Sequence, residues 1–362
     1  MTMRQIRRLA INTGGGDCSG LNAVIRAVVL HACARGIEVL GIEDGLDGLL
    51  PNKPAVVRKL TPEEVRPLLA QGGTILGTSN RGDPFAYRGA DGSVQDLSGA
   101  LLVRARELGI ELLITVGGDG SQAIGLKLQE LGLPVIGVPK TIDNDLDATV
   151  ETFGFGTAVQ VATDALDRLR TTAESHDRIM LLEVMGRDAG WIALHTGMAG
   201  GADVILLPEL AYEPAGVVRD LRRILGSGWR FALIVVAEGA QARSETDGGP
   251  RARGAKIHGG AAQRAADRIA ALLPGVELRV TVLGHVQRGG TPTAYDRLLA
   301  TRLGVEAVEA GLRGESGVLV SSQPPDIRIV SLASAAARVR RVEPEAQIVG
   351  HARALGISFG DR

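Results

Sequence analysis

The chain has few aromatic residues, few cysteines and almost no net charge. Aromatic residues make up 3% of the sequence, and Cys18 and Cys33 are the two cysteines. Two such cysteines form neither a disulfide framework nor a metal-binding pattern, which favours a reducing cytosol. Lys and Arg number 40 against 41 Asp and Glu, a net charge of −1. No overall field therefore favours nucleic acid or an anionic membrane, and any anion binding must be local.

Long hydrophobic runs are also missing. No segment contains about 18 uninterrupted apolar residues, the length that a membrane-spanning helix needs. The basic N-terminal stretch MTMRQIRRLAINTGGG has no apolar run long enough for a signal peptide. We therefore expect a soluble, cytoplasmic protein.

Glycine, in contrast, is abundant: 49 of 362 residues, against an average share of about 7%. Glycines repeatedly follow a short apolar run and precede a helical pattern, as in RRLAINTGGG before LNAVIRAVVLHACARG and IELLITVGGDG before SQAIGLKLQELG. The apolar runs are continuous, whereas strands with one solvated face alternate. The sequence therefore predicts an α/β protein with buried parallel strands.

The length predicts two lobes, each a mainly parallel sheet flanked by helices. Further strands are expected at LPVIGVP, RIMLLEVMG, ADVILLPE, RFALIVVAEG and LRVTVLG. Helices are expected near residues 20–35, 98–109, 156–173, 215–226, 258–273 and 293–312. Residues 244–254 are expected to form a surface loop. We assign residues 1–154 and about 286–313 to the first lobe, and residues 155–285 and about 314–362 to the second.

The first motif is TGGGDCSGLNAVIRAVV, in which a strand runs into Gly14, Gly15 and Gly16 and Asn22 lies at the front of a helix. Exposed backbone N–H groups and the positive end of a helix can together face one anion, so the motif predicts a phosphate cradle. Glycine turns at strand ends also occur for packing reasons alone, and this motif by itself does not exclude that explanation.

The second motif, ITVGGDGSQAIG, places Asp119 between glycines at the start of another helix. A hard cation such as Mg²⁺ takes one or two carboxylates together with phosphate oxygens and water, which fits this arrangement. Asp119 could instead cap the helix. A cap does not explain the glycines on both sides, so we favour the magnesium site.

The third motif is PKTIDNDL, where Asp143 and Asp145 follow a strand. In an extended segment the two carboxylates point the same way, whereas a turn separates them. Such carboxylates can accept a proton from a substrate hydroxyl and help to hold a metal, and Lys140 can pair with a phosphate. An Asx-rich turn without chemistry is the alternative.

Basic side chains recur at the ends of later strands, where ligands of open α/β sheets bind. They are Arg178, Arg187, Arg279, His285 and Arg288. A single arginine at a strand end is usually only solvated, and His285 alone is more often structural. Several arginines together form a bidentate clamp for a phosphate dianion.

The combination of GGGDCSGLN, GGDGS, PKTIDNDL, EVMGR, AEG and GHVQRGG resembles the bacterial-type 6-phosphofructokinases, in the branch that holds both ATP-using and pyrophosphate-using members. The resemblance runs from about residue 6 to about residue 312. GGDG alone also occurs in NAD kinases and lipid kinases. The resemblance implies Mg²⁺-dependent transfer of a phosphoryl group to the 1-hydroxyl of fructose 6-phosphate in glycolysis, with the donor on the first lobe and the sugar phosphate on the second.

The resemblance also implies residue roles. Asp143 matches the base that takes the hydroxyl proton, with Thr141, Asp145 and Lys140 beside it, and Asp119 matches the metal ligand. The donor-binding positions are Gly15, Gly16, Gly118, Gly120 and Ser121, with Arg81 replacing an arginine usual at Asn80. The sugar-phosphate positions are Met185, Gly186, Arg187, Glu238, His285 and Arg288. Arg178 and Arg279 match arginines that reach this site from a neighbouring subunit, so a homo-oligomer is implied.

Two positions bear on the donor. Pyrophosphate users of the family carry Asp where this chain has Gly120, and Lys where it has Lys140. Glycine leaves room for the α-phosphate of a nucleotide, which an acid would occupy and repel, so we expect ATP. Lys140 favours pyrophosphate, and a pyrophosphate-dependent or mixed-donor enzyme is the alternative. A non-catalytic sugar-phosphate sensor is disfavoured because Asp119, Asp143 and Asp145 are all present.

Overall fold

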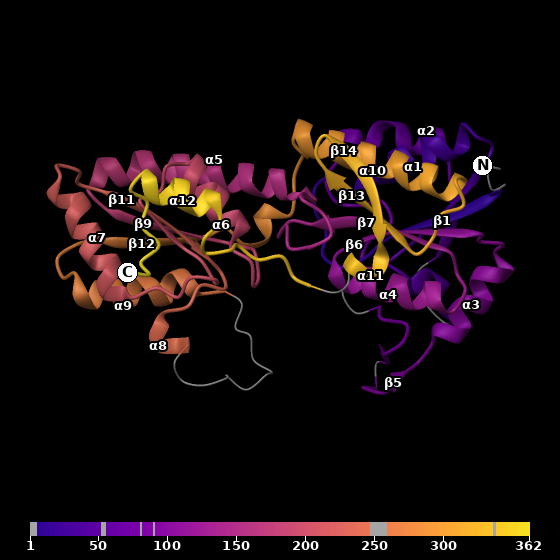
Figure 1. Ribbon diagram of the computed structural model, residues 1–362, viewed down its shortest axis with the longest axis horizontal. Coiled ribbons are helices and arrows are strands. Elements are labelled where there is room, and N and C mark those ends of the chain that lie inside the picture. The colour runs from indigo at the N-terminus through magenta and orange to yellow at the C-terminus, as the bar shows by residue number, and fades with distance from the viewer. Residues whose placement is uncertain (1–5, 52–55, 80–81, 90, 247–258, 336–337) are drawn as a thin grey trace. The chain divides into compact units, whose positions relative to one another are not determined.

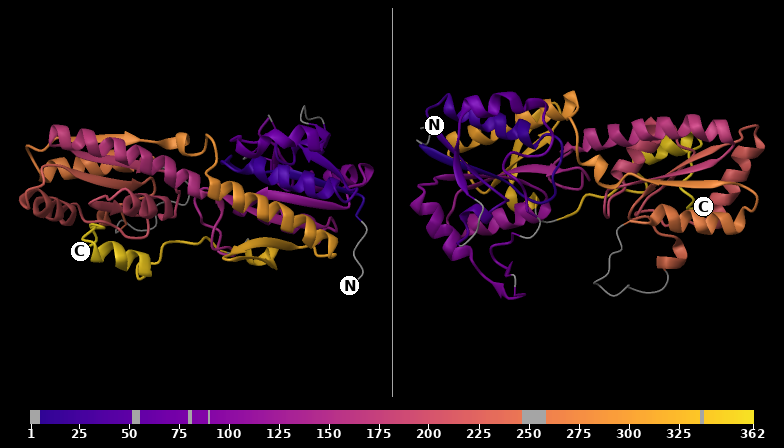
Figure 2. Two further views of the ribbon diagram at one scale, coloured as in Figure 1. Left: turned by 90° about the horizontal axis from the view of Figure 1, so that it is seen from above. Right: turned by 180° about the vertical axis from the view of Figure 1, so that it is seen from behind.

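The computed structural model describes residues 6–51, 56–79, 82–89, 91–246, 259–335 and 338–362, and these divide into two compact units. Unit 1 comprises Met1–Ile142, Leu146–Gly156 and Arg288–Val339. Unit 2 comprises Asp143–Asp145, Thr157–Gln287 and Arg340–Arg362. Each unit has its own sheet with helices on both faces (Figures 1 and 2).

Unit 1 is built on a sheet of eight strands in the order β14-β13-β7-β6-β1-β2-β3, with β8 pairing with β7. The strands are β1 (Arg8–Thr13), β2 (Glu38–Ile42), β3 (Val57–Leu60), β6 (Leu112–Gly117), β7 (Val135–Thr141), β8 (Phe153–Gly154), β13 (Val318–Gln323) and β14 (Asp326–Ser331). The two edge strands, β3 and β14, pair antiparallel, and the other pairings are parallel. The carboxyl ends of β1, β6 and β7 therefore meet at one edge.

Helices cover both faces of this sheet (Figure 1). On one face lie α1 (Leu21–Cys33) and α10 (Ala294–Leu312), and on the other α3 (Ser98–Glu107), α4 (Asp119–Glu130) and α11 (Leu332–Ala335). The short elements are α2 (Pro62–Val65), η1 (Asp47–Leu49), η2 (Arg66–Ala70), β4 (Tyr87–Arg88) and β5 (Val94–Gln95). The helices α1 and α10 approach closely because Gly304 has no side chain: a Cβ there would lie 2.9 Å from the carbonyl oxygen of Val24.

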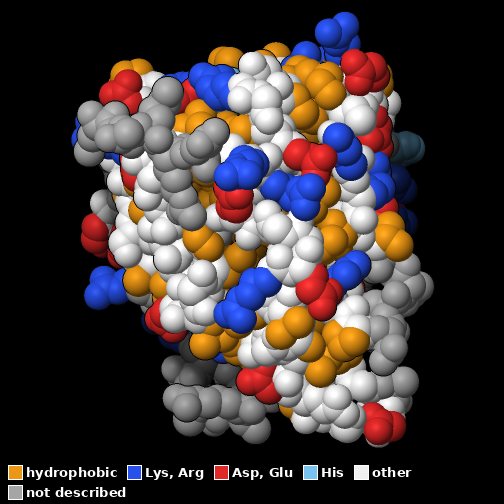
Figure 3. All heavy atoms as spheres, turned by 90° about the vertical axis from the view of Figure 1, so that its right-hand side faces the viewer, with side chains coloured by type: hydrophobic (Ala, Val, Ile, Leu, Met, Phe, Trp, Pro, Cys, Tyr) orange, Lys and Arg blue, Asp and Glu red, His pale blue; other side chains and the backbone are white. Residues whose placement is uncertain are grey.

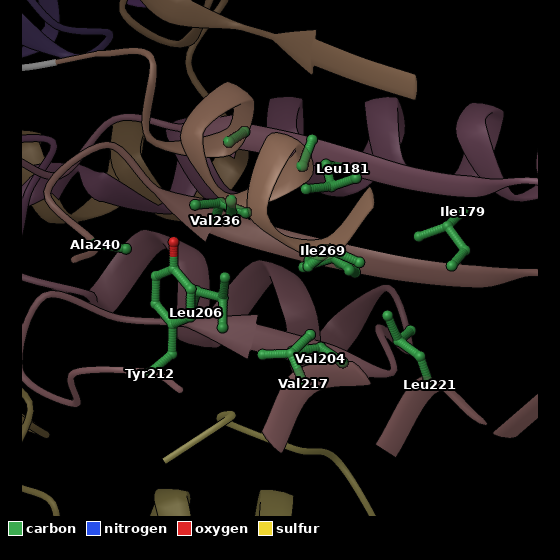
Figure 4. Close-up of a cluster of buried hydrophobic side chains, with 14 of the residues drawn as sticks. Ile179, Leu181, Val204, Leu206, Tyr212, Val217, Leu221, Val236, Ala240 and Ile269 are labelled. Carbon is green, nitrogen blue, oxygen red and sulfur yellow. The ribbon is translucent and has the colours of Figure 1, made fainter. Parts of the chain in front are cut away.

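Unit 2 has a fully parallel four-stranded sheet in the order β10-β11-β9-β12. Its strands are β9 (Ile179–Val184), β10 (Val204–Leu206), β11 (Ala232–Ala237) and β12 (Leu278–Val282). Its helices are α5 (Phe155–His176), α6 (Trp191–Ala199), α7 (Pro214–Gly226), α8 (Arg243–Thr246), α9 (Ala261–Leu272), η3 (Gly284–Gln287) and α12 (Gln347–Ala354). Figure 4 shows the core that α7 and α9 form with one face of the sheet, including Leu206, Val217 and Ile269.

The predicted α/β class, with a mainly parallel sheet in each lobe, is confirmed. The division differs from the expected one at residues 314–339, which lie in unit 1 and not in the second lobe. The reason is that β13 adds to the edge of β7 and carries β14 with it. The run LRVTVLG forms β12, but this strand is at the edge of its sheet and its residues are half-buried or exposed, so it is not a buried strand. The predicted loop at 244–254 and the helix start near His258 fall largely outside the described residues.

On the face in Figure 3, Lys and Arg side chains are interspersed with acidic and hydrophobic ones. Among the described residues, no helix combines the length and apolar character needed to cross a membrane.

Two helical glycines provide a test of this packing. Gly304→Ala should lower stability by about 1–3 kcal/mol, because the methyl group would overpack the contact between α1 and α10. Gly350→Ala in α12, where a Cβ meets nothing within 4 Å, should instead raise stability by about 0.5–1 kcal/mol, through the better helix propensity of alanine. Thermal or urea unfolding measures both. Equal effects of the two changes would contradict the described packing.

Candidate active site

Two glycine turns lie side by side at the carboxyl ends of β1 and β6. The N–H of Gly14 donates to the carbonyl oxygen of Val116 at 2.9 Å. A Cβ on Gly14 would lie 2.6 Å from Oγ of Ser121, and one on Gly117 would overlap the same side chain. Position 117 therefore requires glycine, whereas a side chain at position 14 would force Oγ of Ser121 to shift. Ser121 is thus held between the turns. The predicted donor residues Gly15, Gly16, Gly118 and Ser121 are thus brought together.

Helix α4 begins directly at this place. Gly118 is its N-cap residue, with no side-chain capping bond, and Asp119 is the first helical residue. The capping explanation for Asp119 is therefore not observed. Its side chain is exposed and has no hydrogen-bond or ion-pair partner among the described residues. A Cβ on Gly120 would meet nothing within 4 Å and its φ is not positive, so neither packing nor backbone conformation requires glycine there.

Two cations contact the first glycine turn. Lys140, at the end of β7, is 3% exposed, and its Nζ donates to the carbonyl oxygen of Gly16. Nη1 of Arg288 donates to the carbonyl oxygen of Asp17 at 3.1 Å. A Cβ on Gly16 would lie 2.9 Å from the same Nη1. Arg288, expected with the sugar-phosphate residues, therefore lies in unit 1 beside the glycine turn.

The segment after Thr141 bends away from β7. Asn144 has a φ of 53°, the left-handed conformation that asparagine tolerates better than most residues. The extended arrangement that would point Asp143 and Asp145 the same way is therefore not present. Asp143 is 3% exposed and Asp145 is half-buried. Oδ2 of Asp143 lies 3.9 Å from Nε of Arg187, within unit 2.

The loop from Met185 to Gly190, which we call the 185–190 loop, is held by side chains that accept its backbone N–H groups. Oε1 of Gln287 accepts the N–H of Met185 at 2.8 Å. Oε1 of Glu238 accepts the N–H groups of Gly186 at 3.3 Å and Arg187 at 2.8 Å. The loop is tightly turned, since φ is 141° at Gly186 and 51° at Arg187. The structure thus brings Met185, Gly186, Arg187 and Glu238 together.

A third acceptor, Glu209, holds the far end of the 185–190 loop. Its Oε1 accepts the N–H of Gly190 and that of Val342, each at 2.9 Å. Its Oε2 is buried and has no hydrogen-bond partner among the described residues. Burial is the largest influence on this carboxyl, and it raises the pKa of Glu209 above the ordinary 4.5.

Arg178 and Arg279 share one partner. Nε of Arg178 lies 2.6 Å from Oε2 of Glu277, and Nη2 of Arg279 bonds to Oε1 of the same carboxylate. The hydrogen bond from Arg178 is the largest influence on the Glu277 carboxyl and lowers its pKa, and Arg279 lowers that pKa further. Glu277 thus holds both guanidinium groups together at the start of β9 and β12. The prediction that Arg178 and Arg279 stand at the ends of strands is therefore wrong, because each lies where its strand begins.

The other predicted residues have no hydrogen bond to the glycine turns or the 185–190 loop among those described, or lie outside the described residues. His285 is exposed in η3 and has no hydrogen bond to the 185–190 loop among those described. Arg81 and Asn80 lie outside the described residues. Asn22 does not face the glycine turn: its Nδ2 donates to the carbonyl oxygens of Gln71 and Gly72, and its Oδ1 accepts the N–H of Ile75.

Sequence reasoning assigned no role to Gln287, Glu209 or Glu277. Gln287 stands inside the GHVQRGG motif, which was a usable signal. Glu209 is the last residue of the predicted strand ADVILLPE, but it accepts hydrogen bonds from backbone groups far away in the sequence. No local pattern reveals such a partner.

The residues present fit a magnesium ion that is carried by phosphates. Among the described residues no group of three or more His, Cys, Asp or Glu could hold a metal. Magnesium commonly uses one or two carboxylates and draws its other ligands from phosphate and water. The exposed carboxylate of Asp119 can supply one such ligand, and the positive end of α4 favours the phosphates that carry the ion.

The comparisons with known proteins agree with the resemblance. A sequence profile described as phosphofructokinase matches residues 8–311. The chain is 50% identical over 355 residues to the ATP-dependent 6-phosphofructokinase of Chloroflexus aggregans, covering 98% of each chain. It is 48% identical over 343 residues to the pyrophosphate-fructose 6-phosphate 1-phosphotransferase of Amycolatopsis methanolica, covering 93% of this chain and 97% of that one.

Among solved structures, phosphofructokinase from Saccharomyces cerevisiae matches with a TM-score of 0.77 at 31% identity. The match covers 91% of this chain, and the chain spans 45% of the length of the yeast chain. The protein therefore belongs to the phosphofructokinase family.

Glu209 gives a pH-dependent prediction. A carboxyl whose pKa is raised by folding favours the folded state below its ordinary pKa, and that advantage is lost as the pH rises through the raised value. Glu209→Gln keeps an acceptor at Oε1 and removes the buried charge. The melting temperature of Glu209→Gln should exceed that of the wild type most at pH 7, where the wild-type carboxyl is charged. This difference in melting temperature should shrink towards pH 4.5. Glu209→Ala, which loses both hydrogen bonds, should melt lower at every pH. A pH-independent difference for Glu209→Gln would contradict the role of the buried charge.

Proposed function

We propose that the protein transfers the terminal phosphoryl group of Mg-ATP to the 1-hydroxyl of fructose 6-phosphate, forming fructose 1,6-bisphosphate. The names of its relatives support the acceptor, since both the Chloroflexus and the Amycolatopsis enzymes are named for fructose 6-phosphate or as 6-phosphofructokinases. The names of the relatives also support ATP as the donor, since the Chloroflexus enzyme, 50% identical over 98% of each chain, is named as ATP-dependent. The Amycolatopsis relative, at 48% identity, is named for pyrophosphate, and this donor is kept as the alternative.

The observation that carries the proposal is that unit 1 holds residues suited to a phosphoryl donor, and unit 2 holds residues suited to a sugar hydroxyl. In unit 1, two glycine turns, the start of α4 and the carboxylate of Asp119 suit a chain of phosphates with its magnesium. In unit 2, the carboxylate of Asp143 stands 3.9 Å from Arg187, in a loop whose N–H groups are fixed by Glu238. A carboxylate beside a substrate-binding arginine suits a base for a sugar hydroxyl.

In this proposal catalysis consists mostly of positioning and charge neutralisation. Asp143 accepts the proton of the 1-hydroxyl as that oxygen attacks the terminal phosphorus, and the bond from this phosphorus to the bridging oxygen of the β-phosphate breaks, so that ADP leaves. Thr141 and Asp145 lie beside Asp143 in the chain. Bound magnesium would neutralise phosphate charge next to Asp119. Lys140 is held at Gly16 and supplies a buried positive charge close to the donor.

The surroundings of Gly120 support ATP as the donor. The position has open space and an ordinary φ, so a side chain there would be tolerated by the fold. The absence of a side chain then has a functional explanation, which is to leave room for the α-phosphate of a nucleotide. Lys140 is consistent with this, because its hydrogen bond to Gly16 gives it a place in the glycine turn that does not depend on pyrophosphate.

The sugar-phosphate residues are proposed to be Met185, Gly186, Arg187, Glu238, His285 and Arg288, with Thr141 and Asp143 at the reacting hydroxyl. Arg178 and Arg279 are proposed to act on a neighbouring subunit in a homo-oligomer. Their shared partner Glu277 keeps the two guanidinium groups close together, which suits a phosphate dianion with several oxygens. The proposed donor lobe is unit 1, and the proposed sugar-phosphate lobe is unit 2.

A pyrophosphate-dependent enzyme is the second candidate. The buried Lys140 and the 48% identity to the Amycolatopsis enzyme favour it. Formation of fructose 1,6-bisphosphate from fructose 6-phosphate and Mg²⁺, measured with ATP and with pyrophosphate in separate assays, distinguishes the two. Higher kcat/KM with pyrophosphate would overturn ATP as the donor, and sugar-phosphate binding without turnover would indicate a sensor.

The proposed base is tested by Asp143→Ser. Removal of a general base should lower kcat by about 10²–10⁴-fold with little change in the Kd for fructose 6-phosphate. Steady-state kinetics give kcat, and equilibrium binding gives the Kd. Asp147→Ser, at an exposed position of the same segment, is the control and should leave both values unchanged. Full turnover by the Asp143 variant would refute the assignment.

The donor assignment is tested by Gly120→Asp. The fold should tolerate this change, while the new carboxylate repels a nucleotide phosphate, so kcat/KM for ATP should fall by about tenfold or more. The KM for fructose 6-phosphate serves as the internal control and should change little. Unaltered use of ATP by a folded Gly120→Asp variant would show that this position does not select the donor.

A further inference from the structure

A short segment near the C-terminus, residues 340–342, contacts parts of the proposed active site although it lies outside the family profile, which ends at residue 311. The backbone N–H of Arg340 donates to the carbonyl oxygen of Asp145 at 2.7 Å. Asp145 and Arg340 belong to the same unit. The segment therefore fixes the backbone two residues after the proposed base, Asp143.

The same residue covers the tryptophan that follows the 185–190 loop. Trp191 begins α6 and is 8% exposed. Its Nε1–H donates to the carbonyl oxygen of Arg340 at 3.2 Å. The guanidinium carbon of Arg340 lies 4.5 Å from the centre of the Trp191 ring, a cation–π distance. Backbone and side chain of one residue thus hold the same indole.

A third contact reaches the loop itself. The N–H of Val342 and the N–H of Gly190 share one acceptor, Oε1 of Glu209. Residues 340–342 are therefore connected to Gly190, the last residue of the 185–190 loop, through Glu209. They also bind the following residue, Trp191, directly through Arg340. The beginning of the loop is held separately, by Gln287 and Glu238.

We propose that residues 340–342 are a positioning segment of the active site, with Arg340 as its central positioning residue. They set the backbone of Asp145 and the end of the 185–190 loop relative to each other. This inference rests on the proposed function, because Asp143 and Arg187 are its proposed base and sugar-phosphate ligand. Arg340 contacts neither substrate in this proposal and acts through Asp145 and Trp191.

The rest of the C-terminal region is anchored by its own contacts. Arg353 forms a bidentate pair with Asp361, at 3.0 and 2.6 Å, and lies 4.8 Å from the ring centre of Phe359. The N–H of Ser358 donates to the carbonyl oxygen of Asp203. Loss of the Arg340 side chain should therefore leave this region docked. Arg353 also offers a matched control, since it is an arginine stacked on an aromatic ring in the same region.

The first experiment compares Arg340→Ala with Arg353→Ala. A lost cation–π contact should raise the KM for fructose 6-phosphate by about three- to tenfold in Arg340→Ala, with the KM for ATP unchanged. Arg340→Lys, which keeps a cation over the ring, should recover most of the loss. Arg353→Ala should lower the melting temperature and leave both KM values unchanged. Equal effects of the two alanine variants on the sugar KM would reduce Arg340 to a structural role and overturn the proposal.

A second readout does not depend on turnover. In a Trp229→Phe background, in which Trp191 is the only tryptophan, fructose 6-phosphate without a donor should change the fluorescence of Trp191. The Kd from this titration should be larger by the same three- to tenfold factor in Arg340→Ala, because binding is weaker. Sugar binding with no change in the Kd would contradict the proposal. A wild-type protein that binds and phosphorylates no sugar phosphate would instead refute the proposed function.

The hydrogen bond from Arg340 to Asp145 is donated by the backbone N–H, so Arg340→Ala leaves it in place. Testing this bond requires a variant that lacks the N–H. Arg340→Pro removes the N–H donor together with the side chain. Compared with Arg340→Ala, it should lower kcat by a further factor of about five to ten, since a lost hydrogen bond contributes about 1 kcal/mol. If Arg340→Pro folds and has the kcat of Arg340→Ala, the bond to Asp145 does not position the catalytic segment. If it does not fold, the comparison of Arg340→Ala with Arg353→Ala still decides the proposal.

Discussion

The parallel pairing of β6 with β1 on one side and β7 on the other determines the geometry of the proposed donor half of the site. Parallel neighbours end at the same edge of the sheet, so the chain segments that leave them must begin close together. The glycine turns after β1 and β6 meet around Ser121, and Lys140 at the end of β7 reaches the carbonyl oxygen of Gly16. Three segments separated by tens of residues thus meet beside the positive end of α4, the arrangement on which the proposed phosphate site rests.

In unit 2, the segment that leaves the carboxyl end of β9 is held in a different way. The 185–190 loop turns too sharply for a regular ladder, and its backbone N–H groups need acceptors from elsewhere. Gln287, Glu238 and Glu209 supply them, from three different parts of the chain. An acid that accepts a backbone bond is also fixed in orientation, so Glu238 can support the loop with one oxygen and leave the other for a ligand.

The segment 340–342 extends this principle to the C-terminal region. Backbone groups of Arg340 and Val342 satisfy partners at Asp145, Trp191 and Glu209, so the geometry of the proposed catalytic segment depends on residues outside the family profile. Relatives that differ in this region would then position the same catalytic residues with different contacts.

The α/β class, the buried strands β1, β6, β7, β9, β10 and β11 and the residue clusters around Gly15, Asp119, Asp143 and Arg187 can be predicted from the sequence, because they follow from apolar runs, glycine turns and local acidic or basic motifs. The sequence did not determine that residues 314–339 join the first sheet, that Asn144 turns the Asp143 segment, or that Arg288 lies by the first glycine turn. Nor did it reveal Gln287, Glu209 and Arg340 as supports. These features depend on which strand edge is free and on which distant side chain reaches an unpaired backbone group, and only tertiary structure decides both.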